Sequence, residues 1–140
     1  MANFVLVHGG YQGAWIWKPT AQCLRAAGHN VHAPTLDGCA ERRHEIRPGI
    51  TVSTQAQEVA DLLFYEDIPD AILVGTSFGG MVISKAAELA RATLGQNSVK
   101  HLVYVDALAP QPGETTADIV IRDPDQSPYE ETEFARGPNR

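Results

Sequence analysis

The amino-acid sequence predicts an α/β protein in which helices cover both faces of a parallel sheet, a three-layer α/β/α arrangement. Short apolar runs recur four times along the 140 residues, and stretches with helical spacing separate them. The order of elements is therefore β-α-β-α-β-α-β. Strands joined by helices form parallel pairs with right-handed crossovers, and such sheets are covered on both faces.

The first strand and helix are well marked in the sequence. Residues 4–7, Phe-Val-Leu-Val, are apolar throughout, which is typical of a central strand of a parallel sheet. A glycine-containing loop, residues 9–17, follows, and we expect its two tryptophans to pack in the core. Pro19 suits the first turn of a helix and Gly28 its end. Residues 31–34 form the second predicted strand.

The second strand closes on residues 35–38, and a polar stretch, residues 41–45, then runs to the turn signal Pro48-Gly49. We expect it to be solvated, with Asp37 capping or bracing it. Thr54 and Gln57 match a capping box at the start of a second helix. Apolar residues at helical spacing then continue to Leu63.

The stretch from residue 71 to residue 80 combines a strand, a tight turn and a helix start. Ala71 to Val74 is apolar, and Gly75-Thr-Ser77-Phe-Gly79 is a G-x-S-x-G pattern. This setting is that of a nucleophile elbow, in which Ser projects alone from a strained turn. The following helix directs free N–H groups and a partial positive charge at the reacting oxygen. The alternative is a glycine-rich turn that carries an ordinary Ser.

The last predicted elements complete the sheet. The helix over about residues 79–92 is apolar nearly all round, so we expect it to be buried. Residues 101–105 form a fourth strand that ends at Asp106. We predict the spatial order 31–34, 3–7, 71–75, 100–105, which leaves the last strand as an exposed apolar edge.

The composition changes after residue 108. Residues 1–108 are predicted to form the core, whereas residues 109–140 are acidic and hold five of the nine prolines. This second segment is either the start of a lid region or a disordered tail.

Composition and charge exclude several classes of function. The net charge of −6 argues against nucleic acid or an anionic membrane as a partner. Two cysteines give no disulfide framework, and the first strand starts too near Met1 for a targeting segment, so we expect a cytoplasmic protein. No G-x-G-x-x-G and no P-loop Lys follow the first strand, so a nucleotide binder of similar strand order is disfavoured, and no cofactor or metal is expected.

Three motifs carry a resemblance to a known family. His-Gly-Gly at residues 8–10, Gly-Ala-Trp-Ile-Trp at residues 13–17 and Gly-Thr-Ser-Phe-Gly-Gly at residues 75–80 resemble the α/β-hydrolase superfamily. The branch they resemble most is that of methylesterases and hydroxynitrile lyases. Pro-Thr-Leu-Asp-Gly at residues 34–38 is similar to bacterial carbendazim-type ester and carbamate hydrolases. The resemblance implies a serine hydrolase that acts on small carboxylic or carbamate esters through an acyl-enzyme.

The resemblance also assigns roles to residues. Ser77 would be the nucleophile, and the backbone N–H groups of Gly10 and Phe78 would form the oxyanion hole. The chain supports this, because one donor follows Ser77 at a helix N-terminus and the other lies in the loop after the first strand. Hydroxynitrile lyases of this branch carry Thr where this chain has Gly9, which favours ester hydrolysis.

The chain departs from the family in length. Family members are considerably longer, so these residues resemble the N-terminal part of an incomplete α/β-hydrolase fold. The triad order in this fold is Ser, acid, His, yet His101 is the only histidine after Ser77 and begins a strand, at the wrong end of the sheet. Asp106 is a weak candidate for the acid. The alternatives are a catalytically inactive fragment or small-molecule binding module, and acyl transfer by the same Ser.

Overall fold

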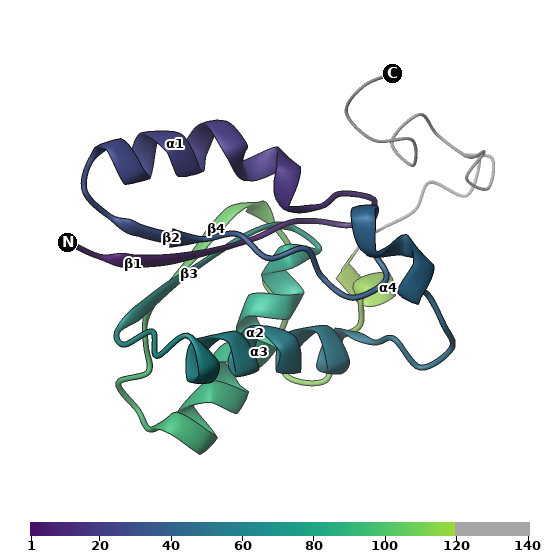
Figure 1. The fold of residues 1–140 in the computed structure, drawn as a ribbon. Helices are drawn as coiled ribbons and strands as arrows, with labels where there is room; N and C mark the ends of the chain where they lie inside the picture. Colours follow the sequence, from purple (N-terminus) through teal and green to yellow (C-terminus); the bar gives the residue numbers. More distant parts are fainter. Residues whose placement is uncertain (120–140) are drawn as a thin grey trace.

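The computed structural model describes residues 1–119 of the chain. Its elements follow the predicted order (Figure 1). They are β1 (Asn3–Val7), η1 (Ala14–Trp17), α1 (Lys18–Ala26), β2 (Asn30–His32), η2 (Ala40–Glu45), α2 (Val52–Tyr65), β3 (Ala71–Ser77), α3 (Gly79–Leu94), β4 (Val99–Ala107) and α4 (Thr116–Ile119).

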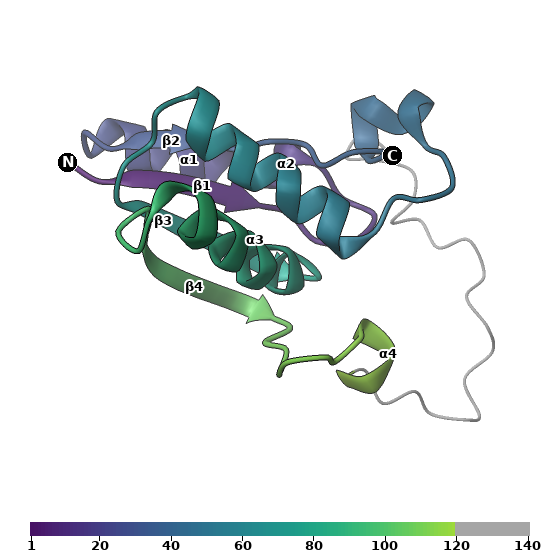
Figure 2. The same ribbon diagram turned by 90° about the horizontal axis from the view of Figure 1, so that it is seen from below.

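The four strands form one parallel sheet in the order β2-β1-β3-β4. The predicted strand order is therefore confirmed. Strands β1 and β3, which have the most continuous apolar sequences, are central. Figure 2 shows β4 at one margin of the folded core, and β4 pairs with β3 along its length.

Helices cover both faces of the sheet, as predicted (Figure 1). Side chains alternate along β1, so Val5 and Val7 point to one face and Leu6 to the other. The first face packs against α2 and α3 in the larger core cluster. The second packs against α1, where Trp17 is buried beside Leu6 and Val74. Trp15 is half-buried, so the expectation for the tryptophans holds fully only for Trp17.

The predicted capping box of α2 is wrong by three residues. The helix begins at Val52, with Thr51 as its N-cap. The N–H of Thr54 donates to Thr51 Oγ1 at 3.2 Å, and the N–H of Thr51 donates to Thr54 Oγ1 at 2.8 Å. At the third helical position, the hydroxyl of Thr54 accepts the hydrogen bond that a Glu or Gln side chain usually accepts in a capping box. A search for Glu or Gln at this position therefore selected Thr54 and Gln57 instead of Thr51 and Thr54.

The chain leaves the sheet after β4. Residues 108–115 run as turns and irregular structure to the short helix α4. Residues 120–140, where most of the predicted lid or tail segment falls, lie outside the described residues. The division at residue 108 therefore stays a prediction. Among the described elements, none is a helix long and apolar enough to cross a bilayer.

Candidate active site

Ser77 occupies a strained turn between β3 and α3. Its φ angle is +49°, in the left-handed region, and its side chain is exposed. The pairing of β3 with β4 shifts between Thr76 and Ser77, so the ladder is interrupted at this residue. The carbonyl of Ser77 accepts a hydrogen bond from the N–H of Leu108 at 3.0 Å. The predicted backbone strain at Ser77 is confirmed, since non-glycine residues rarely adopt this conformation.

The two glycines of the pentapeptide are required by close backbone contacts. A Cβ on Gly75 would lie 2.6 Å from the carbonyl oxygen of Gly79. A Cβ on Gly79 would lie 2.6 Å from the carbonyl oxygen of Val7 at the end of β1. Backbone atoms cannot move aside as a flexible side chain can. Glycine at both positions therefore lets the start of α3 lie against the end of β1.

The loop after β1 also lies directly beside Ser77. A Cβ on Gly9 would lie 2.9 Å from Cβ of Ser77 and 3.2 Å from the carbonyl oxygen of Thr76. The N–H of Gly9 donates to Gln12 Oε1 at 2.9 Å, and its carbonyl lies 2.8 Å from His8 Nδ1. The Gly9 backbone is thus held from both sides directly beside Ser77. Sequence reasoning did not single out Gln12, whose role depends on how the loop folds back.

His8 is a buried structural residue in its neutral form. Its Nε2 accepts a hydrogen bond from the N–H of Leu36 at 2.9 Å, so the proton resides on Nδ1, which donates to the carbonyl of Gly9. Burial lowers the pKa of His8. Because both ring nitrogens are already bonded, His8 fixes the loop and has no free nitrogen with which to accept a proton from Ser77.

Two backbone amides in the segments next to this turn, those of Phe78 and Gly10, have no hydrogen-bond acceptor within residues 1–119. Phe78 is the N-cap of the 16-residue helix α3, and Gly10 is exposed in the loop after β1. The trans peptide between Gly9 and Gly10 places its N–H opposite its C=O. The His8 bond to that carbonyl therefore also sets the direction of the Gly10 N–H.

Most of residues 41–49 in the polar loop after β2 are exposed, as expected, and ion pairs order the loop. Asp37 is buried, and Arg47 binds its two carboxylate oxygens at 2.9 and 2.7 Å. This contact lowers the pKa of Asp37. Arg42 donates to Glu45 at 2.8 Å and pairs with Glu58 of α2 at 2.9 Å. Asp37 thus braces the loop, as predicted.

The same network connects to the loop that carries Gly9. Thr35 Oγ1 donates to Glu41 at 2.6 Å and accepts from the N–H of Ala14 at 3.0 Å. Arg42 also donates to the carbonyl of Thr35 at 2.9 Å. The segments on both sides of His8 are thereby fixed relative to each other.

The other two candidates for the catalytic triad are His101 and Asp106, and neither forms a hydrogen bond to Ser77 through its side chain within residues 1–119. His101 pairs with Ile72 near the start of β3, five residues before Ser77, which is roughly 16 Å along a strand. Asp106 lies at the correct end, because its neighbour Ala107 pairs with Ser77. It is exposed and has a φ angle of +45°, and its carboxylate forms no hydrogen bond or ion pair within residues 1–119. Within residues 1–119, no histidine is hydrogen-bonded to the side chain of Ser77.

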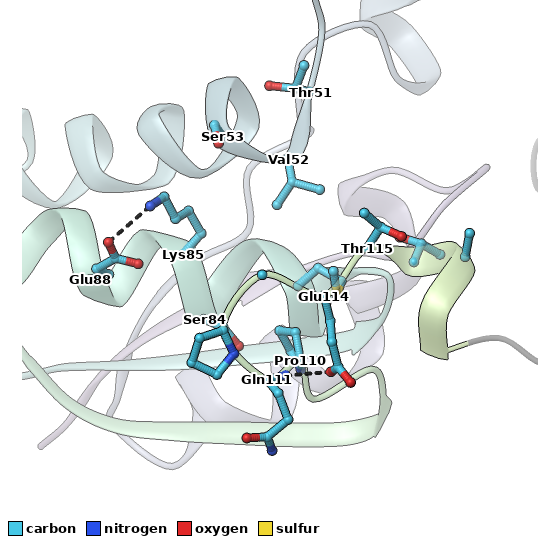
Figure 3. Close-up of a pocket in the computed structure, with 15 residues that line it drawn as sticks. Thr51, Val52, Ser53, Ser84, Lys85, Glu88, Pro110, Gln111, Glu114 and Thr115 are labelled. Atoms are coloured by element: carbon cyan, nitrogen blue, oxygen red, sulfur yellow. Dashed lines mark hydrogen bonds and ion pairs between the residues drawn. The ribbon is translucent and has the colours of Figure 1, made fainter.

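A cavity of about 760 Å³ opens between the start of α2, the middle of α3 and residues 110–117 (Figure 3). Its lining includes Met81, Lys85 and Glu88, with the last two ion-paired at 3.0 Å. Ser77 does not line it. No group of three His, Cys, Asp or Glu residues that could hold a metal occurs within residues 1–119.

Comparisons with known proteins agree with this geometry. Residues 4–138 match the model of the alpha/beta hydrolase family. This chain belongs to the α/β-hydrolase family. Within residues 1–119 its sheet has four strands and is an incomplete form of that fold. The resemblance in the sequence motifs is confirmed.

Individual relatives of this α/β-hydrolase chain include esterases and a lyase. It is 41% identical over 115 residues to the carbendazim hydrolyzing esterase of Nocardioides sp. (strain SG-4G), covering 82% of this chain and 46% of the relative. It is 36% identical to the alpha-hydroxynitrile lyase of Arabidopsis thaliana, and the match covers 77% of this chain and 40% of the lyase. The structure of an extracellular α/β-hydrolase from a Paenibacillus species superposes with a TM-score of 0.74 at 33% identity. The superposition covers 84% of this chain and 46% of the Paenibacillus protein. The hydrolase chain thus spans less than half the length of each.

Proposed function

We propose that this chain is the nucleophile-bearing part of a serine hydrolase that acts on small carboxylic or carbamate esters. The observation that carries the proposal is the left-handed turn at Ser77, held against Gly9 and flanked by two unpaired amides. In the proposed reaction, Ser77 Oγ attacks the ester carbonyl while its proton passes to a base. The N–H groups of Gly10 and Phe78 stabilise the resulting oxyanion. Expulsion of the alcohol leaves an acyl-enzyme, which water hydrolyses.

The base and its acid partner are proposed to come from outside this chain. All five histidines of the sequence lie within residues 1–119. His8 has both ring nitrogens bonded, and His101 lies at the opposite end of the sheet. Since the relatives are more than twice as long as the matched segment, the missing part of the fold would supply them.

The tight contact at Gly9 favours ester cleavage over the lyase reaction. A side chain on Gly9 would meet Ser77 Cβ at 2.9 Å, so this turn has no room for the Thr of hydroxynitrile lyases. The relatives named for ester hydrolysis support the same choice. The cytoplasm is the compartment we propose, because Cys23 and Cys39 are both free thiols.

A hybrid enzyme tests the proposal. Residues 1–107 of this chain would replace the matching part of the Nocardioides esterase, whose own C-terminal half is retained. We expect the hybrid to hydrolyse p-nitrophenyl acetate and to form an acyl-enzyme visible by mass spectrometry. Ser77→Ala should abolish both signals. Thr20→Ala, at an exposed hydroxyl residue of α1, is the control and should leave both unchanged. Turnover that survives Ser77→Ala would contradict the proposal.

The second candidate function is small-molecule binding without chemistry. The cavity of about 760 Å³ that excludes Ser77 favours it. Calorimetry with a non-hydrolysable ester analogue separates the two. Binding that Ser77→Ala leaves unchanged, in a hybrid that forms no acyl-enzyme, would favour a binding module.

A further inference from the structure

The two glycines after His8 are the part of the candidate oxyanion hole with the fewest constraints of their own. Glycine has no Cβ and adopts most backbone conformations readily. A Cβ on Gly10 would meet no heavy atom of the described residues within 4 Å beyond its chain neighbours, so packing at this residue does not hold its peptide. A half-turn of the Gly9–Gly10 peptide would exchange its N–H and its C=O. The direction of the Gly10 N–H therefore depends on contacts made elsewhere.

Two side chains hold the peptides on either side of the Gly9 Cα. His8 Nδ1 donates to the carbonyl of Gly9 at 2.8 Å, which holds the peptide that carries the Gly10 N–H. Gln12 Oε1 accepts from the N–H of Gly9 at 2.9 Å, which holds the preceding peptide. The two bonds together restrain both backbone torsions of Gly9. His8 alone fixes one peptide, and Gln12 fixes the other.

The carboxamide of Gln12 lies in the same cluster of atoms as the serine. A Cβ on Gly9 would lie 2.9 Å from Gln12 Oε1 and 2.9 Å from Ser77 Cβ, so these two atoms are at most twice that distance apart. Gln12 Oε1 thus sits in space that the absence of a side chain on Gly9 leaves open. The oxygen of the carboxamide is the atom that faces Gly9, because a backbone N–H can only donate.

The segment that follows Gln12 is itself fixed. Gly13 is buried, and a Cβ there would lie 2.5 Å from Cβ of Ala40 in η2. The N–H of Ala14 donates to Thr35 Oγ1 at 3.0 Å. These contacts hold the residues after Gln12 against η2 and the loop after β2. Because Gln12 joins this fixed segment to the glycines after β1, its side chain acts as a brace between them.

We propose that Gln12 is a positioning residue for the reaction at Ser77. Its carboxamide oxygen holds the Gly9 peptide, and the Gly10 N–H thereby stays directed at the developing oxyanion. This inference rests on the proposed function, because it assigns Gln12 to the oxyanion hole of that reaction. Gln12 acts through Gly9 and touches neither the ester nor the oxyanion. Its loss should therefore weaken stabilisation of the transition state and leave substrate binding nearly unchanged.

Steady-state kinetics of the hybrid enzyme test the role in the reaction. Gln12→Met removes the acceptor and keeps a side chain of similar length. We expect kcat and kcat/KM for p-nitrophenyl acetate to fall together by about 10–100-fold, less than the roughly 10²–10³-fold that loss of an oxyanion-hole donor costs. KM should change little, since the lost contact matters only in the transition state. Gln22→Met, at an exposed glutamine of α1, is the matched control and should leave both constants unchanged.

Amide hydrogen exchange in the 140-residue chain tests the positioning without turnover. NMR of ¹⁵N-labelled protein resolves the Gly9 amide, whose exchange Gln12→Met should accelerate by about 5–10-fold, as expected for loss of one hydrogen bond. Gln12→Glu should keep the Gly9 amide protected, because a carboxylate also accepts hydrogen bonds. Gln22→Met should leave the exchange rate unchanged. Circular dichroism melts verify that each variant folds.

Either of two results would overturn the inference. The first is an unchanged Gly9 exchange rate in folded Gln12→Met protein. The second, in an active hybrid, is a Gln12→Met variant that keeps its kcat or that changes only KM. A hybrid that forms no acyl-enzyme with Gln12 intact would instead count against the proposed function. The exchange measurement on the 140-residue chain then decides by itself whether Gln12 holds the Gly9 peptide.

Discussion

At the scale of single residues, two of the six non-glycine residues with a positive φ within residues 1–119 lie at the carboxyl ends of strands β3 and β4. Ser77 and Asp106 both have φ angles in the left-handed region, at +49° and +45°. Such a conformation costs a non-glycine residue on the order of 1–3 kcal/mol and persists when the surrounding structure enforces it. At Ser77 that structure is the contact of Gly75 with Gly79 and of Gly79 with the end of β1.

Replacement of Ser77 measures this strain. We expect Ser77→Gly to be more stable than Ser77→Ala by about 1 kcal/mol, because only glycine adopts the left-handed region freely. At Ser53, in the first turn of α2, the order should reverse, with Ala more stable than Gly. Urea denaturation of the four variants checks both differences. The same order at the two sites would argue against strain at Ser77.

The burial of His8 predicts a pH dependence of stability. Its pKa is lowered in the folded state, so the unfolded chain binds the proton more readily. The contribution of neutral His8 is fully present above the unfolded pKa of about 6.5 and is lost as pH falls through the window below it. The slope can reach about 1.4 kcal/mol per pH unit for one proton.

Denaturation measured between pH 7.5 and pH 5 checks the pH dependence of stability that His8 predicts. The free energy of unfolding of the unaltered chain should fall below pH 6.5, and His8→Asn, though less stable throughout, should have a smaller slope there. His44→Asn, at a side chain that is 74% exposed, is the control and should keep the slope. An unchanged slope in His8→Asn would assign the pH dependence to another group.

At the scale of elements, the ion pairs of η2 attach the loop after β2 to α2. Arg42 contacts Glu45, Glu58 and the carbonyl of Thr35. We expect Arg42→Ala to cost roughly 1–3 kcal/mol in the free energy of unfolding, because it leaves charged and carbonyl acceptors unpaired. Arg43→Ala, at an exposed position in the same short helix, should cost less than about 0.5 kcal/mol. Equal losses in urea denaturation would mean that the network contributes little.

At the scale of the whole molecule, the missing base predicts a low rate. We expect the 140-residue chain to hydrolyse p-nitrophenyl acetate at least about 10³-fold more slowly than the hybrid with the Nocardioides C-terminal half. Loss of one triad member leaves only the acceleration from the oxyanion hole and binding, about 10³–10⁴ over water. Fast turnover by the chain alone that Ser77→Ala abolishes would reveal an unrecognised base. His101 and Asp106 would then be examined first.

Several features of the fold could be predicted because they depend on local pattern. Apolar runs at residues 4–7 and 71–74 marked the central strands, and the glycines around Ser77 marked the strained turn. The η2 network could not be predicted in the same way. Glu58 of α2 is 16 residues from Arg42 in the sequence, and only the packing of α2 beside the loop brings their side chains together.

The sequence by itself determined the parallel sheet, its strand order and the position of the strained serine. Continuous apolar runs mark strands buried on both faces, helical spacing marks the buried faces of helices, and glycines mark positions where no Cβ fits. Only the tertiary structure decided what the polar residues do. It placed both ring nitrogens of His8 in hydrogen bonds and paired Arg42 with Glu58 of α2. Hydrogen-bond partners and distances across the sheet depend on segments remote in the chain, which no local pattern encodes.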